Sequence, residues 1–323
     1  MTDPARPARP ALWMISSALL FAVMGALTHA LGPRCDWLTI ALVRAVFMFV
    51  ASATLARAAG ARLVVWRPRT LWMRSLAGSF SLVCSFYALT RLPIGDVLTL
   101  TNTYPLWILV LSWLALQEMP RGVEVLGVAS GLAGVVLIEQ PHLSGDNLAA
   151  LVALLSSFST AVAMLGLHRL RDVDARAVVA HFAGVASIVA GIWLGFRLWG
   201  AGAGAGAGAV ASMTPLSTGA AAIAAAPILP GADPITLAML LGVGATGTLA
   251  QIFLTKAYAA GAPARVAVLA LTQVVFAMGF DVLLWNRTLP AASIVGTVLV
   301  LAPTAWLLRR RTTVSPATVE NPA

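Results

Sequence analysis

Long apolar segments, separated by short polar connections, make up most of the chain. Apolar residues run almost without interruption through stretches such as 97–116 and 148–167. A helix of about 20 apolar residues crosses the roughly 30 Å hydrocarbon core of a bilayer, and it satisfies its own backbone polar groups. Strands of a membrane barrel instead alternate apolar and polar residues over about ten positions. The pattern therefore predicts an all-α polytopic membrane protein.

Ten transmembrane helices are predicted from these segments. In chain order they cover residues 12–30, 37–56, 71–90, 97–116, 123–140, 148–167, 178–199, 234–255, 264–285 and 291–308. Residues 1–11 and 311–323 are expected to form short terminal tails. Because the number of spans is even, both tails are expected on the same side of the membrane.

Composition also indicates a membrane protein, and it argues against a nucleic acid partner. The chain is 59% hydrophobic and 10% charged, whereas a soluble domain has about 25% charged residues. Its net charge is +9, but the basic residues lie between spans rather than in a hydrophilic domain. We therefore expect a lipid bilayer around the protein and no nucleic acid partner. The two cysteines and four histidines show no metal-ligand spacing, and we expect no cofactor.

The basic residues also predict the orientation, since cytoplasmic loops are enriched in Lys and Arg. The outer loops would hold only Arg34, Arg91, Arg197 and Arg287. We therefore expect both termini to be cytoplasmic. The residues assigned to the inner side are Arg6, Arg9, Arg57, Arg62, Arg67, Arg69, Arg74, Arg121, Arg169, Arg171, Arg176, Lys256, Arg265, Arg309, Arg310 and Arg311.

One connection differs from the others in composition. Residues 201–209 read AGAGAGAGA, and a Pro-, Ala- and Ser-rich stretch continues to about residue 233. Such a composition is typical of flexible linkers. The apolar stretch 216–229 is short and contains Gly219 and Pro227, so we expect an outer loop over 200–233 rather than an eleventh span.

The chain resembles two copies of a five-helix unit, residues 12–140 and 148–310. In both copies an aromatic residue, Tyr87 or Tyr258, precedes a short turn and then a long apolar span. Because five is odd, the second copy would be inverted in the membrane relative to the first. Inverted repeats with a central site between them recur among secondary transporters.

The residues that carry a family resemblance lie in both halves. They read YALTRLPIGDVLTLTNTYPLWILVLSWLALQE over 87–118, GVASGLAGVVLI over 127–138 and LTQVVFAMGFDVLLW over 271–285. With Arg44, this sequence resembles the EamA family of the drug/metabolite transporter superfamily. The second half departs from that family, which usually ends its ninth span with Gly-Glu where this chain has Trp285-Asn286.

The resemblance covers about residues 12–310 and implies ten spans in a bacterial inner membrane. It also implies import or export of small polar or amphipathic metabolites, such as amino acids, by alternating access. It names no substrate. Proton coupling, exchange and simple facilitation all stay open.

Charged residues inside spans are the first candidates for function, because they are costly in lipid. Arg44 would lie about 10 Å below the outer interface at 1.5 Å per residue, where it would attract a carboxylate or phosphate, or pair structurally. Asp281 lies at similar depth, and we expect it to form an ion pair or an outer gate with Arg44 in one conformational state. Proton coupling through Asp281 is the alternative role, because burial raises the pKa of a carboxylate. Glu118, at the inner end of the fourth span, is a second gating candidate.

Polar side chains in the fourth and ninth spans suggest a cavity wall, with a kink at Pro105. Such side chains also hold helices together, at about 0.6 kcal/mol each. The predicted substrate-binding residues are Arg44, Tyr87, Asn102, Tyr104, Trp107, Gln251, Thr272 and Gln273.

Glycine motifs in two of the apolar spans have more than one interpretation. Gly242, Gly244 and Gly247 match a dinucleotide fingerprint, but within an apolar span they indicate helix packing instead. Gly127 and Gly131 form a GxxxG motif, with helix packing or a homodimer contact as its two interpretations.

An intramembrane enzyme is one alternative to a transporter. Such an enzyme would need a nucleophile, base or metal cluster, and no GxSxG or HExxH occurs. A receptor or structural protein is the other alternative.

Overall fold

The computed structural model describes residues 9–89, 91–117, 119–141, 147–202, 233–286 and 288–309. All regular elements within these ranges are helices, so the predicted all-α class is confirmed. The helices are α1 (Arg9–Leu31), α2 (Trp37–Ala58), α3 (Arg69–Leu89), α4 (Ile94–Thr101), α5 (Tyr104–Leu116), α6 (Gly122–Glu139), α7 (Asn147–His168), α8 (Ala175–Gly202), α11 (Pro234–Ala260), α12 (Pro263–Ala270), α13 (Thr272–Trp285) and α14 (Ala291–Arg309). Residues 203–232 of the predicted outer loop and the tail 311–323 lie outside the described ranges.

Nine helical stretches in these ranges are long and apolar enough to cross a bilayer, so the chain is a multi-pass membrane protein. Gly95–Leu116 and Pro263–Trp285 each count as one stretch. The predicted third span is not among the nine, because α3 carries Arg69, Arg74 and several serines. It is nevertheless 21 residues long, or about 31 Å, which matches the thickness of the hydrocarbon core.

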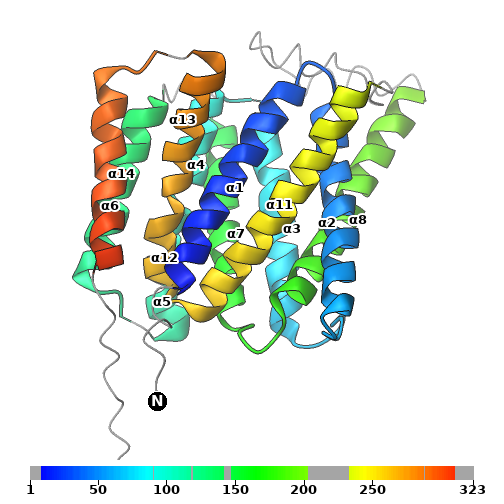
Figure 1. The fold of residues 1–323 in the computed structure, drawn as a ribbon, viewed down its shortest axis with the longest axis horizontal. Coiled ribbons are helices and arrows are strands. Elements are labelled where there is room, and N and C mark those ends of the chain that lie inside the picture. The colour runs from blue at the N-terminus through cyan, green and yellow to red at the C-terminus, as the bar shows by residue number, and fades with distance from the viewer. Residues whose placement is uncertain are drawn as a thin grey trace, which may run out of the picture.

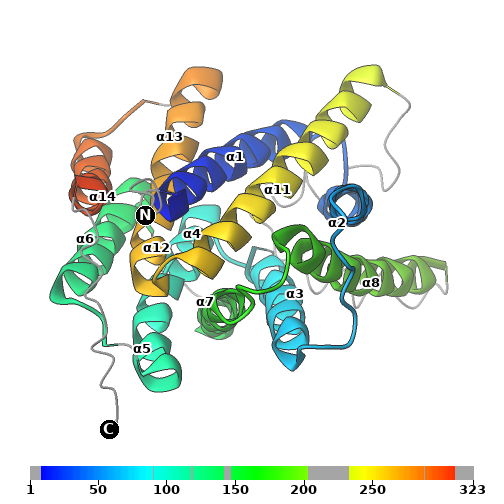
Figure 2. The same cartoon turned by 60° about the horizontal axis from the view of Figure 1, so that its bottom comes forward.

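The helices run side by side, and the chain reverses direction at each end of the bundle (Figure 1). The most extensive contacts join α1 to α11, α3 to α7, α6 to α14 and α2 to α8. Each pair couples helices from different halves of the sequence or from distant parts of it. Figure 2 shows α6 and α14 at one side of the molecule, α2 and α8 at the other, and α1 crossing α11 between them.

Two spans are broken near their middles. The first break separates α4 from α5 at Asn102 and Thr103, just before Pro105. A proline lacks the backbone N–H that a helix interior needs but is tolerated in a first turn. The second break, at Leu271, separates α12 from α13. At the predicted kink the α-helical hydrogen bonding is therefore interrupted for one turn, in which Thr103 bonds to the carbonyl of Leu100. The ninth span, which contains no proline after Pro263, has a similar interruption, in which Leu271 bonds to the carbonyl of Val268.

Glycines allow α6 and α14 to pack closely. A Cβ added at Gly134 would lie 2.5 Å from the carbonyl oxygen of Gly296, and one at Gly131 would lie 2.5 Å from Leu271. Gly127 faces Val268 in the same way. The GxxxG face is thus occupied by α12, α14 and the residue between α12 and α13. The structure supports the first interpretation of this motif, helix packing within the chain. The motif therefore gives no support for a homodimer contact.

The glycines of α11 also allow close packing, here against α1 and α2. A Cβ at Gly244 would lie 2.5 Å from the ring of Phe47 on α2, and one at Gly242 would lie 3.0 Å from Leu27 on α1. The match to a dinucleotide fingerprint is therefore a packing motif, as its position in an apolar span predicts. Large apolar side chains such as Ile188 and Val298 face outward, 63% and 59% exposed. On a soluble protein such a surface would be costly, but lipid covers it here.

Candidate substrate site

Arg74 is the most deeply buried cation of the described helices. The sequence analysis assigns it to the inner connection before the third span, and this assignment is wrong, because Arg74 lies in the second turn of α3 and is 1% exposed. Its guanidinium carbon lies 4.2 Å from the ring centre of Phe182 on α8. Nη2 donates a long hydrogen bond of 3.4 Å to Oε1 of Gln251 on α11. Nε and Nη1 have no partner among the described residues.

Arg44 approaches α11 from the neighbouring helix α2. Its Nη1 donates to the sulfur of Met24 on α1 at 3.4 Å. Its aliphatic stem lies beside Gly247 of α11, 3.6 Å from the position that a Cβ would take. The side chain is partly buried. No ion pair joins Arg44 to Asp281 in the described part of the chain, since Asp281 lies on α13, which packs on α1, α6, α12 and α14.

A seam of hydroxyl groups continues from Arg74 along the contact of α3 with α7. Ser81 lies 2.9 Å from Ser156 and 2.6 Å from Thr160. Ser85 lies 2.7 Å from Ser156. Because these hydroxyls hydrogen-bond to one another, they hold the two helices together. The sequence analysis missed this set, although the four-residue spacing of 81 and 85, and of 156 and 160, marks facing helical positions.

The break between α4 and α5 brings polar groups onto α7. The indole nitrogen of Trp107 donates to Oγ of Ser157 at 3.0 Å, and the hydroxyl of Thr103 lies 2.9 Å from the same oxygen. Tyr104 packs against the buried cluster that contains Tyr258 of α11. Of the predicted binding residues, Tyr104, Trp107 and Gln251 therefore all border the region enclosed by α3, α5, α7 and α11.

Three other predicted binding residues are used locally or lie at the surface. Thr272 is buried and donates to the carbonyl of Leu269 at 2.7 Å, one turn earlier. Asn102 donates through Nδ2 to the carbonyl of Leu98 at 2.8 Å. Gln273 is exposed on α13. The structure does not bring these three side chains to the buried arginines.

The remaining predicted residues lie near the ends of the bundle. Tyr87 is in the last turn of α3, with the guanidinium of Arg91 5.6 Å from its ring centre. Asp281 is partly buried in the second half of α13. Glu118 lies outside the described residues. Tyr87 is thus separated along α3 from Arg74 by 13 residues, or about 20 Å.

Comparison with known protein families finds a match in the first part of the chain. Residues 8–140 match the model of the EamA-like transporter family. This part of the chain is therefore an EamA-like region. The resemblance to EamA proteins of the drug/metabolite transporter type is thereby confirmed, and the matched region ends where the first predicted repeat ends, at residue 140.

Curated relatives of this protein are named as transporters. It is 26% identical over 313 residues to the pseudopaline exporter of Pseudomonas aeruginosa strain UCBPP-PA14, covering 93% of this chain and 96% of the relative. It is 25% identical over 276 residues to the riboflavin transporter of Rhizobium johnstonii, covering 82% and 79%. A solved crystal structure superposes with a TM-score of 0.71 over 92% of this chain and 95% of that one, at 17% identity, which shows that the fold is shared.

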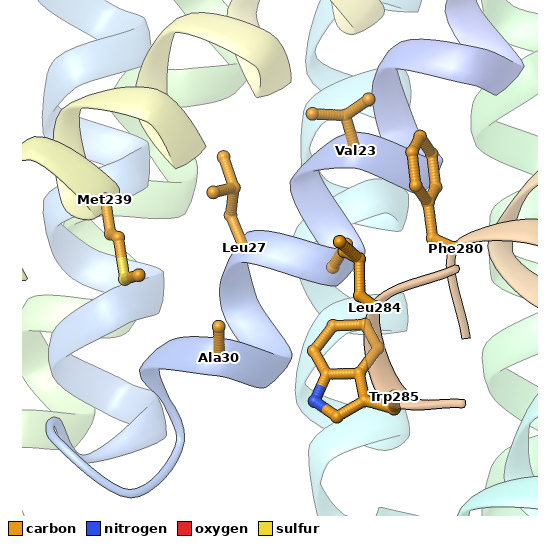
Figure 3. Close-up of a pocket in the computed structure, with 8 residues that line it drawn as sticks. Val23, Leu27, Ala30, Met239, Phe280, Leu284 and Trp285 are labelled. Carbon is orange, nitrogen blue, oxygen red and sulfur yellow. The ribbon is translucent and has the colours of Figure 1, made fainter. Parts of the chain in front are cut away.

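An apolar groove opens on the surface of this protein between α1, α11 and α13 (Figure 3). It has a volume of about 360 Å³, and Leu27, Met239 and Phe280 are among its lining residues. Trp285, also in its wall, packs edge-on against His29 with ring centres 4.6 Å apart. The groove contains no charged side chain, so it is a separate feature from the buried arginines.

The chemistry of the site is that of binding. Among the described residues, no group of three or more His, Cys, Asp or Glu side chains could hold a metal ion. The guanidinium of Arg74 contacts an amide and an aromatic ring, Arg44 packs on the same helix α11, and the hydroxyl groups lie further along α3. These groups can recognise a polar solute through hydrogen bonds and charge.

Proposed function

We propose that the protein is a secondary transporter that moves small polar or amphipathic metabolites across a bacterial inner membrane. It would work by alternating access between two inverted five-helix repeats, residues 12–140 and 148–310. Tyr104, Trp107, Gln251 and Arg44 would line the substrate path. Both termini would be cytoplasmic.

The observation that carries this proposal is the pair of broken spans. Transporter sites form where discontinuous helices leave backbone groups free near the bilayer midplane. Here α4 and α5 separate at Asn102 and Thr103, and α12 and α13 separate at Leu271. In the proposed repeat, Tyr87 corresponds to Tyr258, and with the same offset the first break, at Asn102 and Thr103, falls two to three residues after Leu271. Irregular backbone at this depth is tolerated only where it is buried in protein or lines a cavity.

The relatives support both the activity and the size of the cargo. One is named for export of pseudopaline and one for transport of riboflavin. Both names point to small organic metabolites. Together with the buried polar groups between α3, α5, α7 and α11, they favour a transporter over a receptor or structural membrane protein, the alternative that hydropathy alone leaves open.

The orientation has support from the distribution of arginines. Arg169 and Arg176 lie in the turn and helix that follow α7, at the end of the bundle where α1 begins and α14 ends (Figure 1). Under the positive-inside rule this end faces the cytoplasm.

The test is transport by the purified protein in proteoliposomes. Vesicles are loaded with a mixed pool of amino acids and related metabolites, and their loss is read by mass spectrometry with and without an imposed pH gradient. We expect selective loss of one or a few compounds. Trp107→Ala should reduce that loss, because it removes both an aromatic wall and the hydrogen bond to Ser157.

The matched control is Trp306→Ala, at a partly exposed position near the cytoplasmic end of α14. If folded protein releases no compound above empty vesicles, the transporter proposal fails and a receptor or structural role takes its place. Acceleration by the pH gradient would identify proton coupling, and an unchanged rate would favour exchange or facilitation.

A further inference from the structure

Arg74 lies where four helices meet. Its guanidinium is stacked on Phe182 of α8 and reaches Gln251 of α11. A Cβ added at Gly78, one turn along α3, would lie 2.5 Å from Nη1, and one added at Gly166 of α7 would lie 3.4 Å from Cβ of Arg74. The two glycines therefore make the space that the side chain occupies.

The hydrogen bonding of this side chain is incomplete. At 1% exposure it has one long bond, to a neutral amide, while Nε and Nη1 are unpaired in the described part of the chain. A buried guanidinium normally pairs with a carboxylate, because an uncompensated charge in the interior is strongly unfavourable. Contact with the face of Phe182 offsets part of this cost but uses none of the N–H donors.

Arg44 adds a second cation on the same stripe of α11. Its stem packs at Gly247 and Arg74 bonds to Gln251. These positions are four residues apart, so they share one face of the helix about 6 Å apart along its axis. The only hydrogen-bond acceptor of Arg44 among the described residues is a thioether sulfur, which is a weak one. No Asp or Glu of the described ranges pairs with either arginine.

We propose that Arg74 and Arg44 together bind the oxyanion group of an organic anion, a carboxylate or a phosphate, that the protein carries. The inference rests on the proposed transport function and specifies its substrate class. The planar guanidinium fork matches the geometry of both groups. The anion supplies the negative charge that no side chain of the described ranges supplies to these arginines, and its oxygens accept hydrogen bonds from the guanidinium of Arg74, whose Nε and Nη1 lack partners there.

Two measurements on the purified, full-length protein test this proposal. The first is the shift in thermal unfolding temperature in detergent, and the second is exchange across proteoliposomes. Both use three groups of compounds: succinate, citrate and L-glutamate as carboxylates; glycerol 3-phosphate and ribose 5-phosphate as phosphate esters; and succinamide, L-glutamine and glycerol as neutral analogues. The first two groups distinguish the two sources of the oxyanion.

Four variants accompany the wild type. Arg74→Gln removes the charge, and Arg74→Lys keeps it without the fork. Gly78→Ala keeps Arg74 but places a methyl group where Nη1 now lies. Arg57→Gln is the matched control, since this arginine is exposed at the end of α2. Size-exclusion profiles and unfolding temperatures without ligand establish that each variant is folded.

We expect one group of anions to stabilise and exchange on the wild type and on Arg57→Gln, and the neutral analogues to do neither. In Arg74→Gln and Gly78→Ala the anion concentration needed for half-maximal stabilisation and exchange should rise about tenfold or more, as for loss of a charged hydrogen-bond partner. Arg74→Lys should recover part of the exchange.

The failures of the two proposals are distinguishable. Exchange of neutral analogues that Arg74→Gln leaves unchanged overturns the anion site and leaves the transporter standing. Stabilisation by an anion that depends on Arg74, without exchange of any compound, supports the site and argues against transport. Neither stabilisation nor exchange by any compound overturns both proposals.

Discussion

Single residues decide how closely the helices of this protein approach. At the crossing of α6 with α14, Gly134 lies against the backbone of Gly296, and no flexible side chain there can move aside. In lipid there is little hydrophobic drive between helices, so such close packing carries much of the stability of the bundle.

Replacing Gly134 by Ala should therefore lower the stability of the protein. The added methyl group would lie 2.5 Å from the carbonyl oxygen of Gly296, and overpacking of this kind costs about 1–3 kcal/mol. Thermal unfolding in detergent measures the effect. Gly25→Ala in α1 is the control, because no atom lies within 4 Å of its added Cβ. Equal unfolding temperatures for the two variants would contradict the assigned crossing.

At the end of the bundle where α1 begins and α14 ends, arginine side chains bond to the carbonyl groups that end neighbouring helices. The last carbonyl groups of a helix have no partner within it. Here Arg169 donates to the carbonyl of Ala115 in α5 at 2.7 Å, and Arg176 donates to that of Leu55 in α2 at 3.3 Å. Arg265 donates to the carbonyl of Leu307 in α14. These arginines thus have a structural use beyond orientation, because each ties one helix to the end of another.

Removing one of these contacts should loosen the inner end of the bundle. Arg169→Gln should reduce the free energy of unfolding by about 1 kcal/mol, the typical value of one hydrogen bond, and should increase proteolysis near residue 116. Arg62→Gln, at an exposed loop position, is the control. An unchanged cleavage pattern in Arg169→Gln would show that the contact with α5 contributes nothing.

At the opposite end of the bundle, Asp233 begins α11 and accepts a hydrogen bond from the backbone nitrogen of Ile235. This backbone hydrogen bond, the hydrogen bonds of Thr236 and the charge of Arg34, 2.7 Å away, hold the pKa of Asp233 below its usual value. A lowered pKa in the folded state contributes stability above the unfolded pKa of about 3.9. That contribution is lost as pH falls through the folded pKa.

We therefore expect wild type to lose more thermal stability than Asp233→Asn between about pH 6 and about pH 3. The difference should be small and should shrink in high salt, because both side chains of the Arg34–Asp233 pair are 44% exposed. Unfolding temperatures measured across this range provide the comparison. Parallel curves for the two proteins would rule out a role for the charge of Asp233.

At the scale of the whole molecule, α1 begins and α14 ends at the same end of the bundle (Figure 1). Chemical labelling of cysteines from outside the cell can therefore show on which side of the membrane both termini lie. Cys35 and Cys84 are both buried, and burial raises the pKa of the Cys35 thiol, with Arg34 opposing this effect. Neither cysteine should therefore react readily with a membrane-impermeant maleimide.

Cysteines introduced at exposed connections should then report the orientation. Arg62→Cys, between α2 and α3, should react only after the cells are opened, and Thr288→Cys, between α13 and α14, should react in intact cells. The reverse pattern would place both termini outside. The reaction of the wild-type protein measures the contribution of Cys35 and Cys84, so any additional labelling of a variant comes from its introduced cysteine.

The sequence by itself determined the class, the helices and their order. Continuous apolar runs allow only helices in lipid, so the predicted spans agree with the helices to within a few residues, apart from the breaks. The EamA resemblance was also readable, because motifs such as residues 87–118 are local in sequence. Part of the candidate site followed from chemistry alone, since Arg44, Trp107 and Gln251 are polar groups within apolar spans.

Only the tertiary structure decided which side chains meet. An apolar span has no polar face to show which side is buried, so Gln273 was expected in the site although it is exposed on α13. Arg74 was counted with a loop, because its low-hydropathy surroundings mark a helix end. Its burial depends on space left by Gly78 and Gly166 and on a partner 177 residues away, Gln251. Contacts between segments so distant in sequence depend on packing, which local composition does not specify.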